Sequence, residues 1–139
     1  MSHGIRHLGI LAGGGPEPAE FAQLCLEARL PIVVIGLKGY AEPVHLNELP
    51  HEMVGIGQLK TFLKLLKPAS HVSFVGEISE PPSMGQIRMD TKAMLMAPKF
   101  MKAASGGQDA LRAFAYDFAA QQGLTIISPQ KVRTALGAE

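Results

Sequence analysis

The chain has 139 residues, of which 47% are hydrophobic and 18% are charged, and its formal net charge at pH 7 is +1. A chain of this length fits one domain and buries roughly two thirds of the surface that its unfolded form exposes. The small net charge and the lack of long charge runs exclude a general attraction for nucleic acid. Cys25 is the only cysteine, which excludes an intrachain disulfide and favours the cytoplasm. No signal peptide and no apolar run of about 18 residues is visible, so we expect no membrane span.

The N-terminal part of the sequence predicts a β-α-β unit. The apolar run 8–12 ends in Gly13-Gly14-Gly15, which is typical of a buried parallel strand closed by a turn. Pro16 suits the first turn of a helix, and 32–35 forms the second buried strand. The apolar residues between them recur at helical spacing, at Phe21, Leu24, Cys25 and Ala28.

The pattern repeats in the middle of the chain. Residues 53–54 predict a short strand and 72–75 a further one. The segment 77–92 contains prolines, serine and glycine and predicts a loop. A short helix is expected from about Thr91 until Pro98 kinks or ends it. Between these two predicted strands, apolar residues recur at helical spacing and predict a helix, at Leu59, Phe62, Leu63 and Leu66.

The C-terminal part predicts one more helix and a closing strand over 124–127. Ser105 with Gln108 three residues later matches a capping box, in which Ser105 is the N-cap. Gly123 ends this helix. Its apolar face consists of Leu111, Phe114, Ala115 and Phe118. Alternating strands and helices predict one α/β domain over 1–139, a Rossmann-like three-layer fold with a mainly parallel sheet and helices on both faces.

The loop Gly13-Gly14-Gly15 lies where ligands bind in open parallel sheets, after a strand and before a helix. Backbone N–H groups there favour an anion, and the missing Cβ atoms allow a phosphate or a sugar to approach closely. The loop is no dinucleotide fingerprint, because Pro18 stands where the third glycine belongs, and no Lys-Ser or Lys-Thr pair follows it. Ligand contact and a tight turn that packs helix on strand both stay open. Gly14 is expected to resist substitution if its φ is positive.

Common catalytic motifs are absent from the sequence. It contains neither a GxSxG nucleophile elbow nor an HExxH zinc motif. No residue is assigned as catalytic or as a metal ligand on these grounds. The histidines lack metal-ligand spacing and predict surface or strand-end positions, at His3, His7, His45, His51 and His71.

Five further segments occur in a fixed order along the chain. They are LGILAGGG (8–15), LKGYAEP (37–43), VGIGQL (54–59), FVGEIS (74–79) and GQDALR (107–112). Together they resemble the N-terminal domain of the LpxI-type UDP-2,3-diacylglucosamine diphosphatases of lipid A biosynthesis. The resemblance covers nearly the whole chain.

The resemblance implies half of a two-domain enzyme. The family hydrolyses UDP-2,3-diacylglucosamine to lipid X and UMP with a divalent metal, usually Mg²⁺, and its second domain carries the acids held responsible for catalysis. That C-terminal catalytic domain is absent from these 139 residues. We therefore expect the chain alone to be inactive and to hold no metal tightly. The implied partners are UDP-2,3-diacylglucosamine or lipid X and the missing domain, and the implied location is the cytoplasm, peripheral to the inner membrane.

The same resemblance predicts substrate-binding residues. Two positions depart from the family pattern, since Glu77 replaces an asparagine and Gln108 replaces one of two neighbouring acids. A carboxylate cannot donate a hydrogen bond and repels a diphosphate. A first-turn acid favoured by the helix dipole is the competing interpretation of Asp109. The expected substrate-binding set is Gly13, Gly14, Gly15, Gly76 and Glu77 at strand ends and Gly107 and Asp109 at a helix start.

The segment from Met84 to Lys102 is rich in methionine and in basic residues. Met84, Met89, Met94, Met96 and Met101 lie there, interleaved with Arg88, Lys92 and Lys99. Adaptable methionines beside basic residues suit acyl chains or an anionic membrane surface. Filling gaps beneath an irregular loop is the other interpretation, and the sequence favours it.

Two functions from other classes stay open. One is a free-standing module that binds nucleotide-sugars or other anions. The other is an interaction domain that forms a homo-oligomer through an apolar face. Nucleic acid is not an expected partner.

Overall fold

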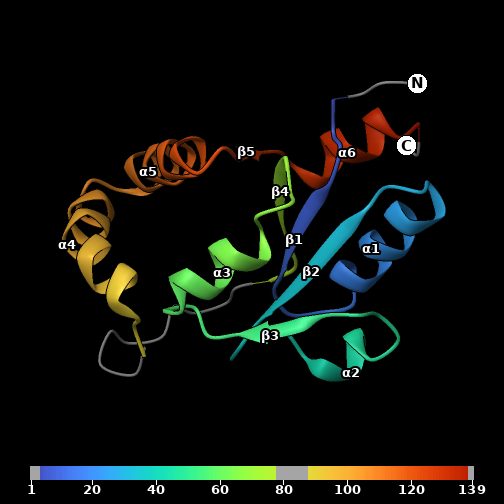
Figure 1. Cartoon of the computed structure of the whole chain (residues 1–139), viewed down its shortest axis with the longest axis horizontal. Coiled ribbons are helices and arrows are strands. Elements are labelled where there is room, and N and C mark those ends of the chain that lie inside the picture. Colours follow the sequence, from blue (N-terminus) through green and yellow to red (C-terminus); the bar gives the residue numbers. More distant parts are fainter. Residues whose placement is uncertain (1–3, 78–87, 138–139) are drawn as a thin grey trace.

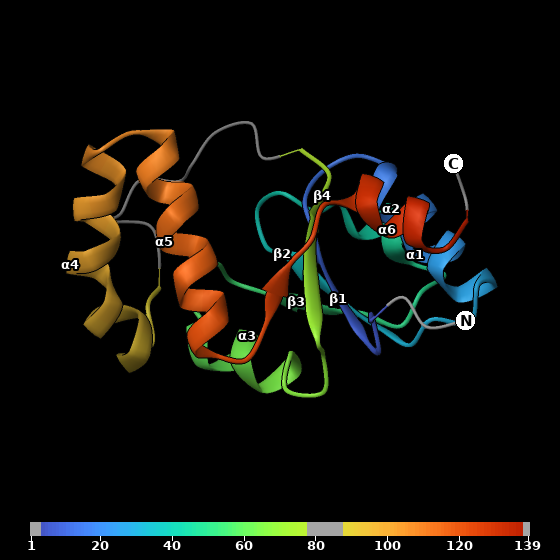
Figure 2. The ribbon, with the colours of Figure 1, turned by 90° about the horizontal axis from the view of Figure 1, so that it is seen from above.

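The computed structural model describes residues 4–77 and 88–137, without the side chains of Gln108, Leu111 and Arg112. The described part is a layered α/β structure, with helices on either side of a central sheet (Figures 1 and 2). No helix in this part is long and apolar enough to cross a membrane.

The sheet of the described part has five parallel strands in the order β3-β2-β1-β4-β5. β1 (Leu8–Ala12) lies at its centre, between β2 (Ile32–Leu37) and β4 (His71–Val75). β3 (Glu52–Val54) and β5 (Thr125–Ile126) form its edges. All five residues of β1 are buried, because side chains of this central strand meet helices on both faces.

Three helices cover one face of the sheet: α1 (Glu17–Glu27), α2 (Pro43–Leu46) and α6 (Pro129–Ala135). The core on this side is closely packed, since Phe21 of α1 and Val132 of α6 are fully buried. Fully buried strand and helix residues complete it, among them Leu8, Ile10, Ala12, Ala22 and Cys25.

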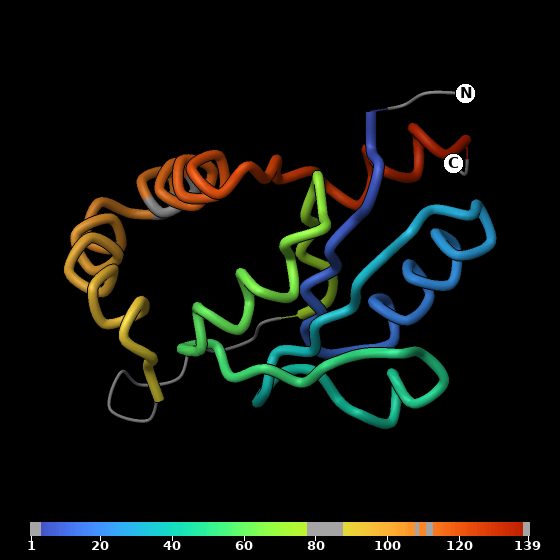
Figure 3. The backbone as a smooth tube through the Cα atoms, in the orientation of Figure 1, coloured from blue at the N-terminus to red at the C-terminus, as the bar shows by residue number. Residues whose placement is uncertain are grey.

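On the other face, α3 (Leu59–Leu65) and α5 (Gln108–Gln121) pack against the sheet through a second core cluster. α4 (Thr91–Ser105) contacts α3 and α5. Figure 2 shows α5 between α4 and the sheet, and α4 as the outermost element at that end of the molecule. The backbone trace in Figure 3 follows α4 through a turn into α5, and Figure 2 shows the two helices side by side and antiparallel. The predicted α/β Rossmann-like fold, with a parallel sheet and helices on both faces, is therefore confirmed.

The predicted start of the last large helix was wrong. Ser105 is the final residue of α4, and its Oγ donates to the carbonyl oxygen of Lys102 at 2.7 Å. The N-cap of α5 is Gly107, with φ +94° and no side-chain cap. Gly106 and Gly107 reverse the chain between two helices, so the serine that resembled an N-cap belongs to the preceding helix end.

The helix around Pro98 is longer than predicted. It begins at Thr91 as expected but continues through Pro98 to Ser105. Proline removes one backbone hydrogen bond of the helix. Met94, whose carbonyl loses its partner, is 60% exposed, so water reaches this side of the helix. The loop predicted over 77–92 falls largely on residues outside the described part.

Candidate functional site

The strand order reverses direction between β1 and β4. The chain runs outward from β1 to β2 and β3 in one direction, and β4 and β5 lie on the opposite side. Ligands of open parallel sheets bind at this switch point, outside the carboxyl ends of the strands. Gly13, Gly14 and Gly15 follow β1 there, and Gly76 and Glu77 follow β4. We call these five residues the glycine edge.

Backbone hydrogen bonds join the two halves of the glycine edge. The N–H of Gly14 donates to the carbonyl oxygen of Glu77 at 2.8 Å, and the N–H of Glu77 donates back at 3.0 Å. The N–H of Gly13 donates to the carbonyl oxygen of Val75 at 2.8 Å. These two glycines therefore use their N–H groups within the protein, which argues against an anion cradle built from them.

The glycines are needed because the two chain segments approach so closely. A Cβ atom on Gly13 would lie 2.6 Å from the carbonyl oxygen of Glu77. Gly76 has φ +103°, and its Cβ would lie 2.7 Å from the carbonyl oxygen of Gly14. Gly14 itself is not among the glycines with positive φ, so the strain expected there is found at Gly15 and Gly76.

The charges at the glycine edge are negative. Glu17 and Glu20 lie in the first turn of α1, and Glu17 and Glu77 are exposed. The carboxylates offset the positive potential that the helix dipole creates at the N-terminus of α1, and they repel phosphate. Carboxylates accept hydrogen bonds from hydroxyl groups. This edge therefore suits a sugar better than a bare anion.

The other two predicted substrate residues lie elsewhere. Gly107 and Asp109 are exposed at the start of α5. The α4–α5 turn lies at the outer end of the molecule in both orientations, away from β1 (Figures 1 and 2). The structure thus brings together five of the seven predicted residues and does not bring Gly107 and Asp109 to them.

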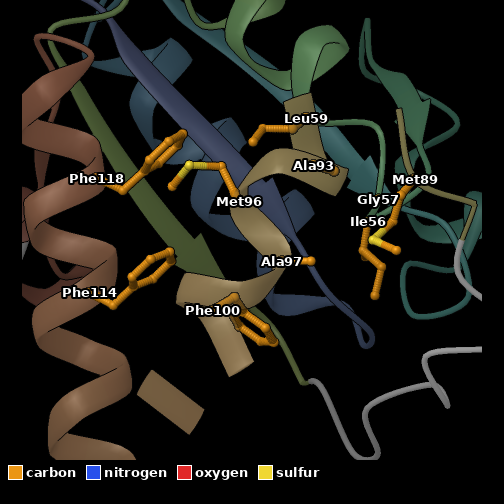
Figure 4. Close-up of a pocket in the computed structure, with 10 residues that line it drawn as sticks. All are labelled: Ile56, Gly57, Leu59, Met89, Ala93, Met96, Ala97, Phe100, Phe114 and Phe118. Atoms are coloured by element: carbon orange, nitrogen blue, oxygen red, sulfur yellow. The ribbon is translucent and has the colours of Figure 1, made fainter. Parts of the chain in front are cut away.

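A large apolar chamber lies beside the glycine edge, beneath α4. It consists of two adjoining cavities of about 330 and 430 Å³, sizes found for small-molecule pockets. Figure 4 shows α5 on one side of the first cavity, α4 across it, and the segment before α3 opposite. Both cavities share Ile56, Leu59, Phe100, Phe114 and Phe118.

Aromatic rings form the wall of the chamber between α4 and α5. Phe100 meets Phe114 edge to face at 6.1 Å between ring centroids, and Phe114 stacks with Phe118 at 6.4 Å. Met96 extends from α4 toward Phe118 (Figure 4). The sequence predicted that Phe114 and Phe118 belong to a helix face, but they are only half-buried and border open space.

The floor of the chamber and the glycine edge lie close together along β1 and β4. Leu11 of β1 and Phe74 of β4 are register partners, and both line the second cavity. Phe74 is 49% exposed although it is an aromatic residue on an inner strand. Two residues beyond each of these positions stand Gly13 and Gly76. An apolar cavity and a polar edge therefore adjoin, an arrangement suited to an amphiphilic molecule.

The methionine-rich segment divides between two environments. Met89 and Met96 line the chamber. Met94 and Met101 line neither cavity and are 60% and 57% exposed. Met84 lies outside the described residues. Gap filling beneath a loop therefore does not describe Met94 and Met101.

Candidate metal ligands do not cluster in the described part of the chain. No group of three or more histidine, cysteine, aspartate or glutamate residues there is placed to hold a metal ion. Burial raises the pKa of the Cys25 thiol to about 11, although Arg133 opposes the shift. An unreactive core thiol follows from this.

The histidines occupy structural positions, as predicted for those that are described. His7 immediately precedes β1, and His71 is the first residue of β4. His51 Nδ1 lies 2.8 Å from the carbonyl oxygen of Leu49. His45 Nε2 lies 3.6 Å from a carboxylate oxygen of Glu42. His3 lies outside the described residues.

The strand order and the helices on both faces define the class of protein, a Rossmann-like α/β domain. The sequence matches the LpxI N-terminal domain family over residues 7–136, and the chain belongs to that family. The resemblance noted in the sequence is thereby confirmed.

A relative from Caulobacter vibrioides, named UDP-2,3-diacylglucosamine pyrophosphatase LpxI, is 32% identical to the chain over 130 residues. The match covers 92% of the chain and 46% of the relative, so the chain spans about half the length of that protein.

Proposed function

We propose that this chain is the substrate-holding N-terminal domain of a UDP-2,3-diacylglucosamine pyrophosphatase of lipid A biosynthesis. In this role it binds the acylated sugar, and the remainder of the enzyme supplies the acids that hold Mg²⁺ for hydrolysis to lipid X and UMP. Family membership and the named relative support the reaction class.

The adjoining positions of chamber and glycine edge carry the proposal. The two acyl chains of the substrate are apolar, and the chamber offers apolar walls of leucine, methionine and phenylalanine. The sugar then lies at the glycine edge, where Glu17 and Glu77 accept hydrogen bonds from its hydroxyl groups. Leu11 and Phe74, which line the second cavity, stand two residues before Gly13 and Gly76 and so lie between the two.

The same geometry directs the diphosphate away from this domain. Glu17 and Glu77 repel it, and the N–H groups of Gly13 and Gly14 are already bonded. Cleavage of a diphosphate needs charge stabilisation and a positioned water. Because the described carboxylates do not cluster, we assign this chemistry to the part of the enzyme beyond this chain.

A turnover assay tests this division of labour. The 139-residue chain is incubated with UDP-2,3-diacylglucosamine and Mg²⁺ or Mn²⁺, with the intact Caulobacter relative as positive control, and the products are separated. We expect no UMP above a buffer blank from the chain alone. Metal-dependent UMP release that Asp109→Ala abolishes would contradict the proposal and place the active site in this domain.

A binding module without a part in catalysis is the alternative. It predicts that UMP and inorganic phosphate bind as tightly as the acylated nucleotide-sugar. The apolar walls of the chamber favour the acylated ligand, since neither of these anions has an acyl chain to place there.

A further inference from the structure

The outer side of α4 is an apolar surface without a partner among the described residues. Leu95 is 74% exposed, and Met94 and Met101 are 60% and 57% exposed. Figures 1 and 2 show α4 at the outer end of the molecule, with α3 and α5 on its inner side only. Exposed large apolar side chains gathered on one helix mark an interaction surface.

Only part of the apolar surface of α4 lines the chamber. Ala93, Met96, Ala97 and Phe100 recur at helical spacing and line it. By helical geometry Leu95 lies on the side opposite these residues, and Met94 and Met101 lie on a flank between the two; all three are exposed. The packing that holds α4 in place therefore does not explain these three side chains.

Lysines lie on α4 beside the exposed residues Met94, Leu95 and Met101, and no acid lies there. Lys99 and Lys102 are exposed, and Lys92 is half-buried. No aspartate or glutamate occurs between Thr91 and Ser105. The acid that precedes the helix, Asp90, is occupied by the backbone N–H groups of Ala93 and Lys60. The outer face of α4 is therefore apolar and positively charged.

We propose that this outer face of α4 docks on an anionic lipid surface. Apolar side chains enter the boundary between headgroups and acyl chains, while lysine stems extend so that their ammonium groups contact the phosphates. The helix lies in the plane of the surface. The lipid beneath it and the chamber behind it are then separated only by α4.

Charge decides between a membrane and a second copy of the chain. A two-fold symmetric dimer through α4 would bring Lys99 and Lys102 of both subunits into one interface, because such an interface uses the same surface on both subunits. α4 has no acid to pair with them. An anionic surface removes this repulsion and matches the charge.

The proposal does not rest on the proposed function, because it requires neither substrate nor hydrolysis. Its test is co-sedimentation of the chain with phosphatidylcholine vesicles, with and without phosphatidylglycerol. Three proteins are compared with the wild type: Leu95→Glu, the pair Lys99→Glu and Lys102→Glu, and a control pair, Lys64→Glu in the last turn of α3 and Lys67→Glu just after it. The control lysines are also exposed, so the net charge changes equally.

We expect binding to the anionic vesicles only, weakened by salt. Both α4 variants should lower the partition coefficient by about tenfold or more, and the control pair should change it much less. Circular dichroism confirms that each variant is folded. Equal binding to neutral vesicles, or an equal loss in the control pair, would overturn the proposal. So would wild-type binding by Leu95→Glu, or a dimer in sedimentation velocity that Leu95→Glu dissolves.

Discussion

Gly76 holds a conformation that other residues adopt only with strain. Its φ is +103°, and a Cβ would meet the carbonyl oxygen of Gly14 at 2.7 Å and Pro18 Cγ at 2.9 Å. Gly39 has a similar φ of +92°, but nothing lies within 4 Å of the position of its Cβ. Substitution of Gly39 measures the cost of backbone strain alone, whereas substitution of Gly76 adds the cost of a steric clash.

We therefore expect Gly76→Ala to lower the free energy of unfolding by about 2–4 kcal/mol and Gly39→Ala by about 1 kcal/mol. Urea denaturation followed by circular dichroism measures both. Equal losses in the two variants would show that the contact between the β1 and β4 loops contributes nothing.

Cys25 predicts a pH dependence of stability. Burial raises its pKa from 9.0 to about 11 in the folded protein. Between these pH values the unfolded thiol loses its proton while the folded thiol keeps it, so stability falls as pH rises and is unaffected below pH 9. We expect wild type to lose up to about 2 kcal/mol more than Cys25→Ala over this range. A pH-independent difference between the two denaturation curves would contradict the shift.

The starts of α3 and α4 are joined by Asp90. Its Oδ1 accepts the N–H of Ala93 at 2.8 Å, which caps α4, and its Oδ2 accepts the N–H of Lys60 at 2.6 Å. Gln58 Nε2 also donates to the carbonyl oxygen of Arg88 at 2.7 Å. These bonds close the end of the chamber lined by Gly57 and Met89.

Asp90→Ala should therefore destabilise the protein by about 0.5–2 kcal/mol and speed amide exchange in the first turns of α4. Ser128→Ala is the matched control, because Ser128 caps α6 through the N–H of Lys131. Its effect should be confined to α6. Unchanged exchange in α4 of Asp90→Ala would exclude the bridging role.

Elements with strong local patterns were predicted, and those fixed by long-range contacts were not. β1, β2 and β4 were predicted from their apolar runs, and α3 was predicted from apolar residues at helical spacing. α6 has only seven residues, and its place in the core depends on Val132, which is fully buried against residues distant in sequence. α2, with four residues, gives equally little periodicity.

The candidate site was predicted in part for the same reason. The glycines after β1 and β4 fall at the switch point of the sheet, which the order of the elements already implies. The chamber needs α4 and α5 to be placed relative to the sheet, and no local pattern provides that placement. Its one signal was the set of methionines; among those that the structure describes, only Met89 and Met96 line the chamber.

For the molecule as a whole, the sheet provides two unequal faces. The face under α1, α2 and α6 is closed by fully buried residues such as Phe21 and Val132. The face under α3 and α5 opens into the chamber, and Phe74 on an inner strand is left half exposed. One face therefore supplies stability, and the other retains apolar space for a ligand.

The central claim is that this space takes an acyl chain while the glycine edge takes the sugar. Filling the chamber tests it with little disturbance elsewhere. Ala97 lines the chamber, whereas Ala104 lies on the same helix but is exposed. Ala97→Phe and Ala104→Phe therefore add the same atoms inside and outside the proposed site.

The most direct measurement is the affinity of the two variants and the wild type for a short-chain diacylated UDP-glucosamine, determined by titration calorimetry with UMP as the second ligand. We expect the wild type and Ala104→Phe to bind the acylated ligand more tightly than UMP. Ala97→Phe should lose about tenfold or more of this affinity, since each excluded methylene contributes about 0.8 kcal/mol. Equal affinity of Ala97→Phe and wild type, or equal binding of UMP and the acylated ligand, would contradict the account.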